Sequence, residues 1–297
     1  MSTCIKLIKR NVKLFFKDKG MLFTSLITPI ILLVLYATFL ANVYEQSLTE
    51  NLPNSIELSK SVIDGFVASQ LMSSLLAVSC VTVAFSSNFL MVQDKVNGTI
   101  KDFKTSPVKS SILSLSYYIA TLISTFIISI LAMCACLGYV YIKGWYMSSS
   151  DVIMLFIDVV LLILFGTALS SVINFFLTTQ GQITAVGTMV GAGYGFICGA
   201  YMPISSFSEG LQKIIMFLPG TYATSLIRNH SLRGVLDEFN SQGIPKMILT
   251  SMKDVFDCNL YFFDKKVEMT TMYLILCITI ILLLAFYILL NKFKKAN

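Results

Sequence analysis

The amino-acid sequence predicts an all-α polytopic membrane protein with six transmembrane helices. Of its residues, 56% are hydrophobic and only 13% are charged, about half the roughly 25% charged residues of a soluble domain. The apolar residues gather in runs as long as the ~20 residues that a helix needs to cross a bilayer. Lysines flank the runs at both chain ends, which predicts by the positive-inside rule that both termini are cytoplasmic.

The net charge of +6 follows from this topology and not from a basic patch. Basic residues border the apolar runs, so the sequence predicts no nucleic-acid partner. The seven cysteines are scattered, and the single histidine, His230, has no metal-ligating side chain beside it at ligand spacing. We therefore expect no metal site. The expected location is the cell membrane, with the lipid bilayer around the spans.

Residues 1–19 are predicted to form an amphipathic helix in the cytoplasmic headgroup layer, since their lysines and Arg10 share one helical face. A charged lead-in to the first span is the alternative. Residues 21–44 form the first predicted span. The acidic segment 45–64 is expected on the outer side.

The second predicted span, residues 65–92, has one polar face. Lipid cannot satisfy polar side chains, so this face must meet protein or water. Two interpretations are open: the wall of a substrate path, or helix packing through small residues and interhelical hydrogen bonds. The residues of the candidate path are Ser69, Gln70, Ser73, Ser74 and Asn88.

The basic loop at residues 94–109 connects the second and third spans. Asn97-Gly98 is expected to end the second span, and Thr99 to cap a short helix over residues 100–105. Ser106 and Pro107 are expected to start the third span as its N-cap and first helical residue. Phe103 is the apolar residue among charged ones in the short helix.

This loop resembles the cytoplasmic loop of type-2 ABC exporter permeases. The pattern is an acidic residue, Gly-Thr, about five residues, then Ser-Pro-Val and a basic residue. The resemblance implies a coupling helix that docks on a cytoplasmic ATPase subunit, with Asp102 in place of the family's usual glutamate. An ordinary basic loop that obeys the positive-inside rule is the alternative. The residues assigned to coupling are Asp94, Gly98, Thr99, Asp102, Phe103, Ser106 and Pro107.

Residues 110–142 and 152–177 form the third and fourth predicted spans. Asp158 lies about two helical turns inside the fourth span. An intramembrane carboxylate is a functional candidate, although at this depth the side chain could also reach the headgroups.

The fifth predicted span, residues 183–201, carries a glycine at every fourth position. This pattern lets two helix backbones approach closely and favours packing on another span or on a second subunit. A flexible, bent helix is the alternative. The glycines are Gly187, Gly191, Gly195 and Gly199.

Residues 202–268 form the largest external segment, before the sixth span at residues 269–290. Ser206 and Glu209 have the spacing of a capping box, and residues 211–218 and 222–233 are expected to form short re-entrant or interfacial helices. Residues 234–266 are a long insertion. The segment resembles the stretch before the last span in drug-type members of the same family. The matching residues are Pro203, Leu211, Leu218, Pro219, Thr221, Tyr222, Leu226 and Arg228.

The sequence contains no Gly-x-x-x-x-Gly-Lys-Ser/Thr phosphate loop, so we expect no enzymatic activity and no cofactor in this chain. The resemblance implies ATP and magnesium on a separate ATPase subunit, a second permease copy or related permease, and export of a drug, peptide or lipid-like substrate. A polysaccharide or glycolipid exporter and a non-transporting membrane sensor or scaffold are the alternatives.

Overall fold

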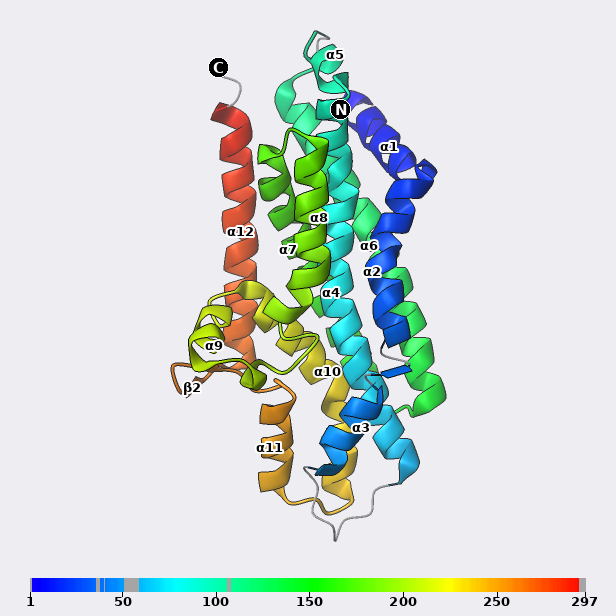
Figure 1. Cartoon of the computed structure of the whole chain (residues 1–297), viewed down its shortest axis with the longest axis vertical. Helices are drawn as coiled ribbons and strands as arrows, with labels where there is room; N and C mark the ends of the chain where they lie inside the picture. The colour runs from blue at the N-terminus through cyan, green and yellow to red at the C-terminus, as the bar shows by residue number, and fades with distance from the viewer. Residues whose placement is uncertain (1, 36–37, 40, 51–58, 106–107, 294–297) are drawn as a thin grey trace.

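The computed structural model describes residues 2–35, 38–39, 41–50, 59–105 and 108–293. These residues form an elongated bundle of helices that run mostly along its long axis (Figure 1). The all-α prediction is confirmed, apart from one short β-hairpin. The elements are α1 (Ser2–Lys17), α2 (Lys19–Leu35), α3 (Ala41–Glu50), α4 (Lys60–Val96), α5 (Thr99–Thr105), α6 (Ser110–Lys143), α7 (Ser149–Phe176), α8 (Gln180–Ile197), η2 (Ile204–Ser206), α9 (Glu209–Ile215), α10 (Pro219–Ser241), α11 (Lys246–Val255), β1 (Tyr261–Phe262), β2 (Lys265–Lys266) and α12 (Met269–Phe293).

The 37-residue helix α4 is the axis of the bundle. It packs against α2, α6, α7, α8 and α10, and all but one of its side chains at residues 65–92 are buried. A helix covered on all sides has no solvent-facing stripe, which explains why its sequence is apolar or small around the whole circumference.

A glycine sets the closest approach between α4 and α7. A Cβ atom at Gly166 of α7 would lie 3.1 Å from the Cα atom of Val81 and 3.3 Å from the Cβ atom of Ala84. The absence of a side chain therefore lets the two backbones meet.

Four helices in the described residues are long and apolar enough to cross a bilayer: α4, α6, α7 and α12. A fifth span is added if α1 and α2, which meet at a bend of 72°, are counted together. The predicted first and fifth spans correspond to the shorter α2 and the glycine-rich α8. The prediction of a multi-pass helical membrane protein is thus confirmed, whereas six spans stay a prediction.

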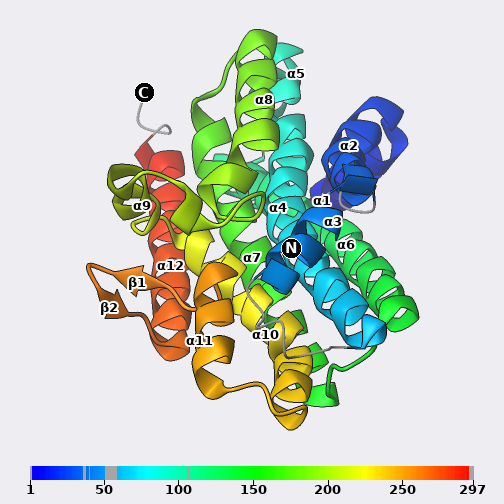
Figure 2. The ribbon, with the colours of Figure 1, turned by 60° about the horizontal axis from the view of Figure 1, so that its bottom comes forward.

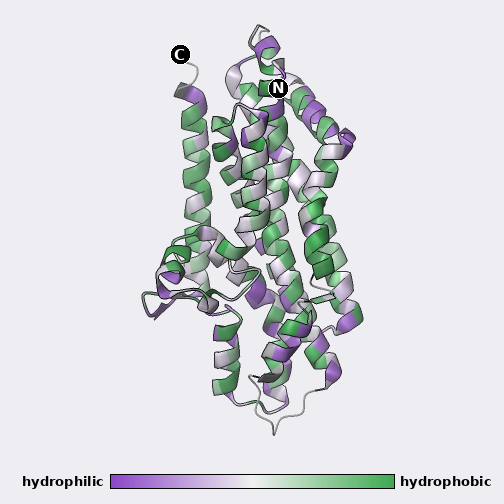
Figure 3. Cartoon of the chain, in the orientation of Figure 1, coloured by the Kyte–Doolittle hydropathy of each residue, from purple (hydrophilic) through white to green (hydrophobic). Residues whose placement is uncertain are grey.

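Polar elements gather at the two ends of the bundle. α1, α5 and the last turns of α12 lie at one end, and α3, α11 and the hairpin lie at or toward the other (Figures 1 and 2). Hydrophobic residues dominate the middle (Figure 3). This arrangement agrees with a bilayer across the middle of the bundle and with the expectation that both termini share one side.

The predicted first span, residues 21–44, covers parts of two elements. α2 is described to Leu35 and α3 from Ala41, and α3 packs against α4. Residues 36, 37 and 40 lie outside the described residues. Residues 51–58 of the predicted acidic loop lie outside the described residues.

The segment before α12 also differs from the prediction. The helix expected over residues 222–233 is the 23-residue α10, which packs against α4, α7 and α12 and is therefore part of the bundle. Pro219 stands in its first turn, where its missing N–H costs nothing. The predicted capping box is wrong, because Ser208 is the N-cap residue of α9 and Ser206 belongs to η2.

We predict that Gly166→Leu destabilises the bundle by about 1–3 kcal/mol, because the new side chain would push α7 away from α4. Gly138→Leu is the matched control, since a Cβ at Gly138 of α6 would have no atom within 4 Å. Thermal unfolding in detergent checks this. Equal unfolding temperatures for the two variants would contradict the close contact.

We predict that Met247→Cys reacts with a membrane-impermeant thiol reagent in intact cells, whereas Lys101→Cys reacts only after lysis. Met247 on α11 is 81% exposed and lies at the end opposite α5, which the Lys-rich loop places inside. Cys258 is buried and cannot serve as the probe. Replacing Cys4, Cys134 and Cys277, the three cysteines that are not buried, by alanine removes background labelling. The reverse pattern would overturn the orientation.

Candidate functional site

The loop after α4 begins with a turn that requires glycine. α4 ends at Val96 with Asn97 as its C-cap residue, and Gly98 follows with a φ of +80°. Residues with a side chain rarely adopt this conformation, so Gly98 sets the direction in which α5 leaves α4. Thr99 is the first residue of α5, so the short helix begins one residue earlier than predicted.

Asp94 joins three helices beneath this turn. Its buried carboxylate accepts hydrogen bonds from Arg10 of α1 at 2.7 Å and from the Tyr117 hydroxyl of α6 at 2.5 Å. A second Arg10 nitrogen lies 3.3 Å from the other carboxylate oxygen. A buried charge is stable only with such charge-assisted partners. Asp94 therefore fastens α1 and α6 to the end of α4.

The α5 helix turns one face to the bundle and another to solvent. Phe103 packs against the hydrophobic core, and the Arg10 guanidinium carbon lies 5.2 Å from the centre of its ring, a cation–π distance. Lys101, Asp102 and Thr105 are exposed. The exposed face of α5, more than the Phe103 ring, is thus available to another protein.

The third predicted span begins at Ser110, as expected, but its N-cap residue differs from the prediction. α6 begins at Ser110, with Lys109 as the residue before it in extended conformation. Ser106 is therefore not the N-cap of this helix. Ser106 and Pro107 themselves lie outside the described residues.

Lys95 connects this loop to the turn between α7 and α8. Its Nζ atom donates to the carbonyl oxygens of Asn174, Phe175 and Leu177 at 2.8–3.0 Å. These carbonyls end α7, where a positive charge is favourable. The α7–α8 turn carries no charge in its own sequence, and Lys95 supplies one from a distant part of the chain.

A groove of about 360 Å³ lies between α2, α4 and α8. Ile27, Phe85 and Phe89 give it apolar walls, and threonine and glutamine side chains add polar atoms. Gly187 and Gly191 of α8 line it as well. A groove of this composition suits an amphipathic molecule or another apolar helix.

The glycines of α8 do not form one continuous stripe. A Cβ at Gly187 would lie 3.3 Å from the Phe89 ring, and Gly195 is covered by the Tyr201 ring of the same chain. Gly199 comes after the end of α8 and has a φ of +73°, so it terminates the helix. The predicted four-glycine seam is corrected to Gly187 and Gly191 on the groove.

The polar residues of α4 point into the subunit. The Asn88 amide donates to the hydroxyls of Ser170 and Ser171 on α7 at 3.1 Å and 2.9 Å. Ser69, Gln70, Ser73 and Ser74 are buried as well, and none of the five is among the described residues that line the groove. Their placement favours the packing alternative over the substrate path.

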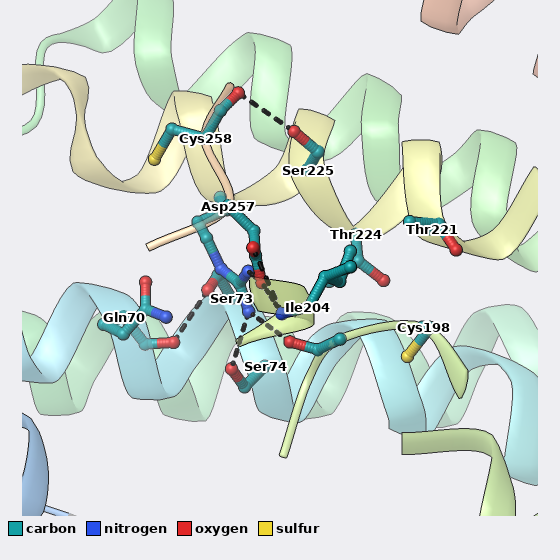
Figure 4. Close-up of polar contacts among 12 residues, drawn as sticks. Gln70, Ser73, Ser74, Cys198, Ile204, Thr221, Thr224, Ser225, Asp257 and Cys258 are labelled. Atoms are coloured by element: carbon teal, nitrogen blue, oxygen red, sulfur yellow. Dashed lines mark hydrogen bonds and ion pairs between the residues drawn. The ribbon is translucent and has the colours of Figure 1, made fainter. Parts of the chain in front are cut away.

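A buried ion pair between Arg228 and Asp257 links the segment before α12 to α4. Arg228 of α10 is 1% exposed and donates to Asp257 at 3.3 Å, to the Gly199 carbonyl at 3.0 Å and to Ser74 at 3.4 Å. Asp257 also accepts from the backbone N–H of Ile204. Figure 4 shows Asp257 and Ile204 between α10 and α4. The Arg228 guanidinium therefore links α10 to three parts of the chain: α4, the residues that follow α8 and the residues that follow α11.

Asp158 does not reach the headgroups. Its carboxylate is 2% exposed, accepts a hydrogen bond from the Tyr273 hydroxyl of α12 at 2.5 Å, and lies 2.6 Å from Nδ1 of His230 on α10. The headgroup interpretation is wrong, because these partners cover the carboxylate. The sequence could not show this, because it predicted His230 in a short re-entrant or interfacial helix and gave no sign of a contact with the fourth span.

These features define a multi-pass helical membrane protein. Its central helix is followed at one end by a short, anchored helix, and a buried ion pair contacts it at Ser74. The family model of the ABC-2 type transporter matches residues 3–230. The chain therefore belongs to the ABC-2 type transporter family and is a membrane subunit of such a transporter. No curated protein matches the chain.

We predict that the free energy of unfolding of the natural protein rises relative to that of Asp257→Asn as the pH falls from 7 to 5. Burial raises the pKa of Asp257 to about 6, and Arg228 lowers it less than burial raises it. The folded state then binds more protons than the unfolded state between the ordinary pKa and 6, so folding is favoured as pH falls through 6.

Thermal unfolding of both proteins at the two pH values measures this difference. A natural protein that loses stability relative to Asp257→Asn at pH 5 would show that the ion pair, and not burial, dominates the pKa of Asp257.

Proposed function

We propose that this chain is the permease subunit of an ATP-driven exporter, energised by a separate ATPase subunit that binds ATP and magnesium. Family membership and the anchored α5 helix support this proposal. The observation that carries it is the Asp94 network together with the Arg10–Phe103 contact. Asp94 joins α1, α4 and α6 at one end of the bundle, and Arg10 in turn lies over the Phe103 ring of the short helix α5. A helix held in this way can receive a push from a docked partner.

The proposed mechanism transmits motion of the ATPase pair through α5. Closure of the two ATPases on ATP would displace α5. Asp94 would carry this displacement to α1 and α6 through Arg10 and Tyr117. Lys95 would carry it to the end of α7 and to the turn that leads into α8. Movement of α8 relative to α4 would then change the width of the groove between them.

The proposed substrate is amphipathic or hydrophobic, such as a drug, a peptide or a lipid-like molecule. The groove supports this class because phenylalanine and isoleucine side chains share its lining with threonine and glutamine. The neighbouring faces of α2 and α8 expose large apolar side chains, among them Phe23 and Met189. A second permease subunit that covered these faces would enclose the groove as a central path.

We predict that Asp102→Arg weakens co-purification with the ATPase subunit and abolishes the stimulation of ATP hydrolysis by substrate. Asp102 is exposed on α5, so its replacement should change the stability of the bundle by under about 0.5 kcal/mol. The charge reversal would place a repulsive or unpaired group at the docking surface.

Asp237→Arg is the matched control, because Asp237 is also exposed on a helix and lies near the opposite end of the bundle. The measurements are pull-down from membranes and ATP hydrolysis by the reconstituted complex. Normal binding and normal stimulation in Asp102→Arg would reject the coupling role. Equal losses in both variants would indicate a nonspecific charge effect instead.

A further inference from the structure

A two-residue turn at the tip of the β-hairpin carries an unusual residue. Tyr261 pairs with Lys266 and Phe262 with Lys265, so Phe263 and Asp264 form the turn. Both have positive φ, 45° and 64°, as in the type I′ turn that normally takes Asn-Gly. A bulky residue is unfavourable in this conformation. The chain thus places a phenylalanine where the backbone would be more stable with asparagine or glycine.

The Phe263 ring belongs to an exposed aromatic cluster. Phe262 lies 4.8 Å from it and 5.1 Å from Phe217, measured between ring centres. Phe217 follows α9 and is 65% exposed, and Phe263 is 60% exposed. Ile214 of α9 is exposed as well. We call Ile214, Phe217, Phe262 and Phe263 the aromatic tip.

The surroundings of the aromatic tip indicate what covers it. The hairpin runs within three residues into α12, whose outward side chains, such as Leu274 and Ile278, are exposed in a helix apolar enough to span the bilayer. α9 and the hairpin lie beside the beginning of α12 (Figures 1 and 2). Lys265 and Lys266 stand exposed next to the rings. Large apolar side chains such as phenylalanine, with lysines beside them, are typical of segments that lie in the membrane–water boundary.

We propose that the aromatic tip inserts into the headgroup boundary of the bilayer leaflet at this end of the bundle. The rings enter the upper acyl region, and Lys265 and Lys266 face lipid phosphates. Lipid contact compensates the unfavourable turn, because burial of an exposed aromatic ring is favourable. The hairpin lies beyond the residues that match the ABC-2 family model. The inference depends on membrane insertion and not on the proposed transport.

The test uses a single tryptophan as a depth probe. Trp145 is the one native tryptophan, so Trp145→Phe provides a background for Phe263→Trp. The full chain is reconstituted in phosphatidylcholine vesicles with lipids brominated near the headgroup or near the chain end. Met247→Trp in the same background is the control, because Met247 is exposed on α11, away from the aromatic tip.

We expect fluorescence from Phe263→Trp to be quenched by the shallow bromines more than by the deep ones, and to be protected from aqueous iodide. The control should show the opposite: strong quenching by iodide and none by bromine. Equal iodide quenching at both positions would place the tip in water and overturn the proposal. Protection from both quenchers would also overturn it, because a protein surface would then cover the tip.

Discussion

The absence of water from the bilayer core is the constraint on which this structure depends. A polar side chain inside the membrane must find a partner within the protein, since lipid offers none. The buried position of α4 answers this constraint: Asn88 bonds to serines of α7, and Ser74 bonds to Arg228 of α10. Asn88 and Ser74 therefore each fix a neighbouring helix, and the bonds that satisfy these two side chains also hold α7 and α10 against α4.

The charged side chains Asp94, Lys95 and Arg228 also have partners within the protein, and each links different helices. Toward one end, Asp94 and Lys95 lie next to each other in sequence but face different helices, α1 with α6 and the end of α7. Toward the other end, Arg228 gathers a serine of α4 and two chain segments that precede and follow α9–α11. The apolar middle between them carries the groove. Polar bonds thus set the geometry at both ends, while the lining of the groove is left free for apolar contacts.

The fold class and the four long apolar helices could be predicted from the sequence, because a helix that crosses the bilayer needs a long run of apolar residues. The sequence also predicted the turn at Gly98, which depends on local backbone conformation. It did not predict the partners of polar residues. Arg10 and Asp94 are 84 positions apart in the sequence, and Asp158 and His230 are 72 apart. A local sequence pattern cannot predict contacts between residues so far apart in the chain. α10 was predicted too short because its polar residues, Arg228 among them, are buried by tertiary contacts that periodicity does not show.

The continuity of α4 has a mechanical consequence. At 1.5 Å per residue its 37 residues measure about 55 Å, nearly twice the roughly 30 Å of the hydrocarbon layer. A rigid rod of this length is a lever: a tilt of about 5° around its middle moves each tip by about 2–3 Å in opposite directions. One tip is fastened to α1 and α6 through Asp94, and Arg228 holds the helix at Ser74, four residues from its middle. A swing on one side of the membrane therefore appears as a counter-swing on the other, with no helix broken between them.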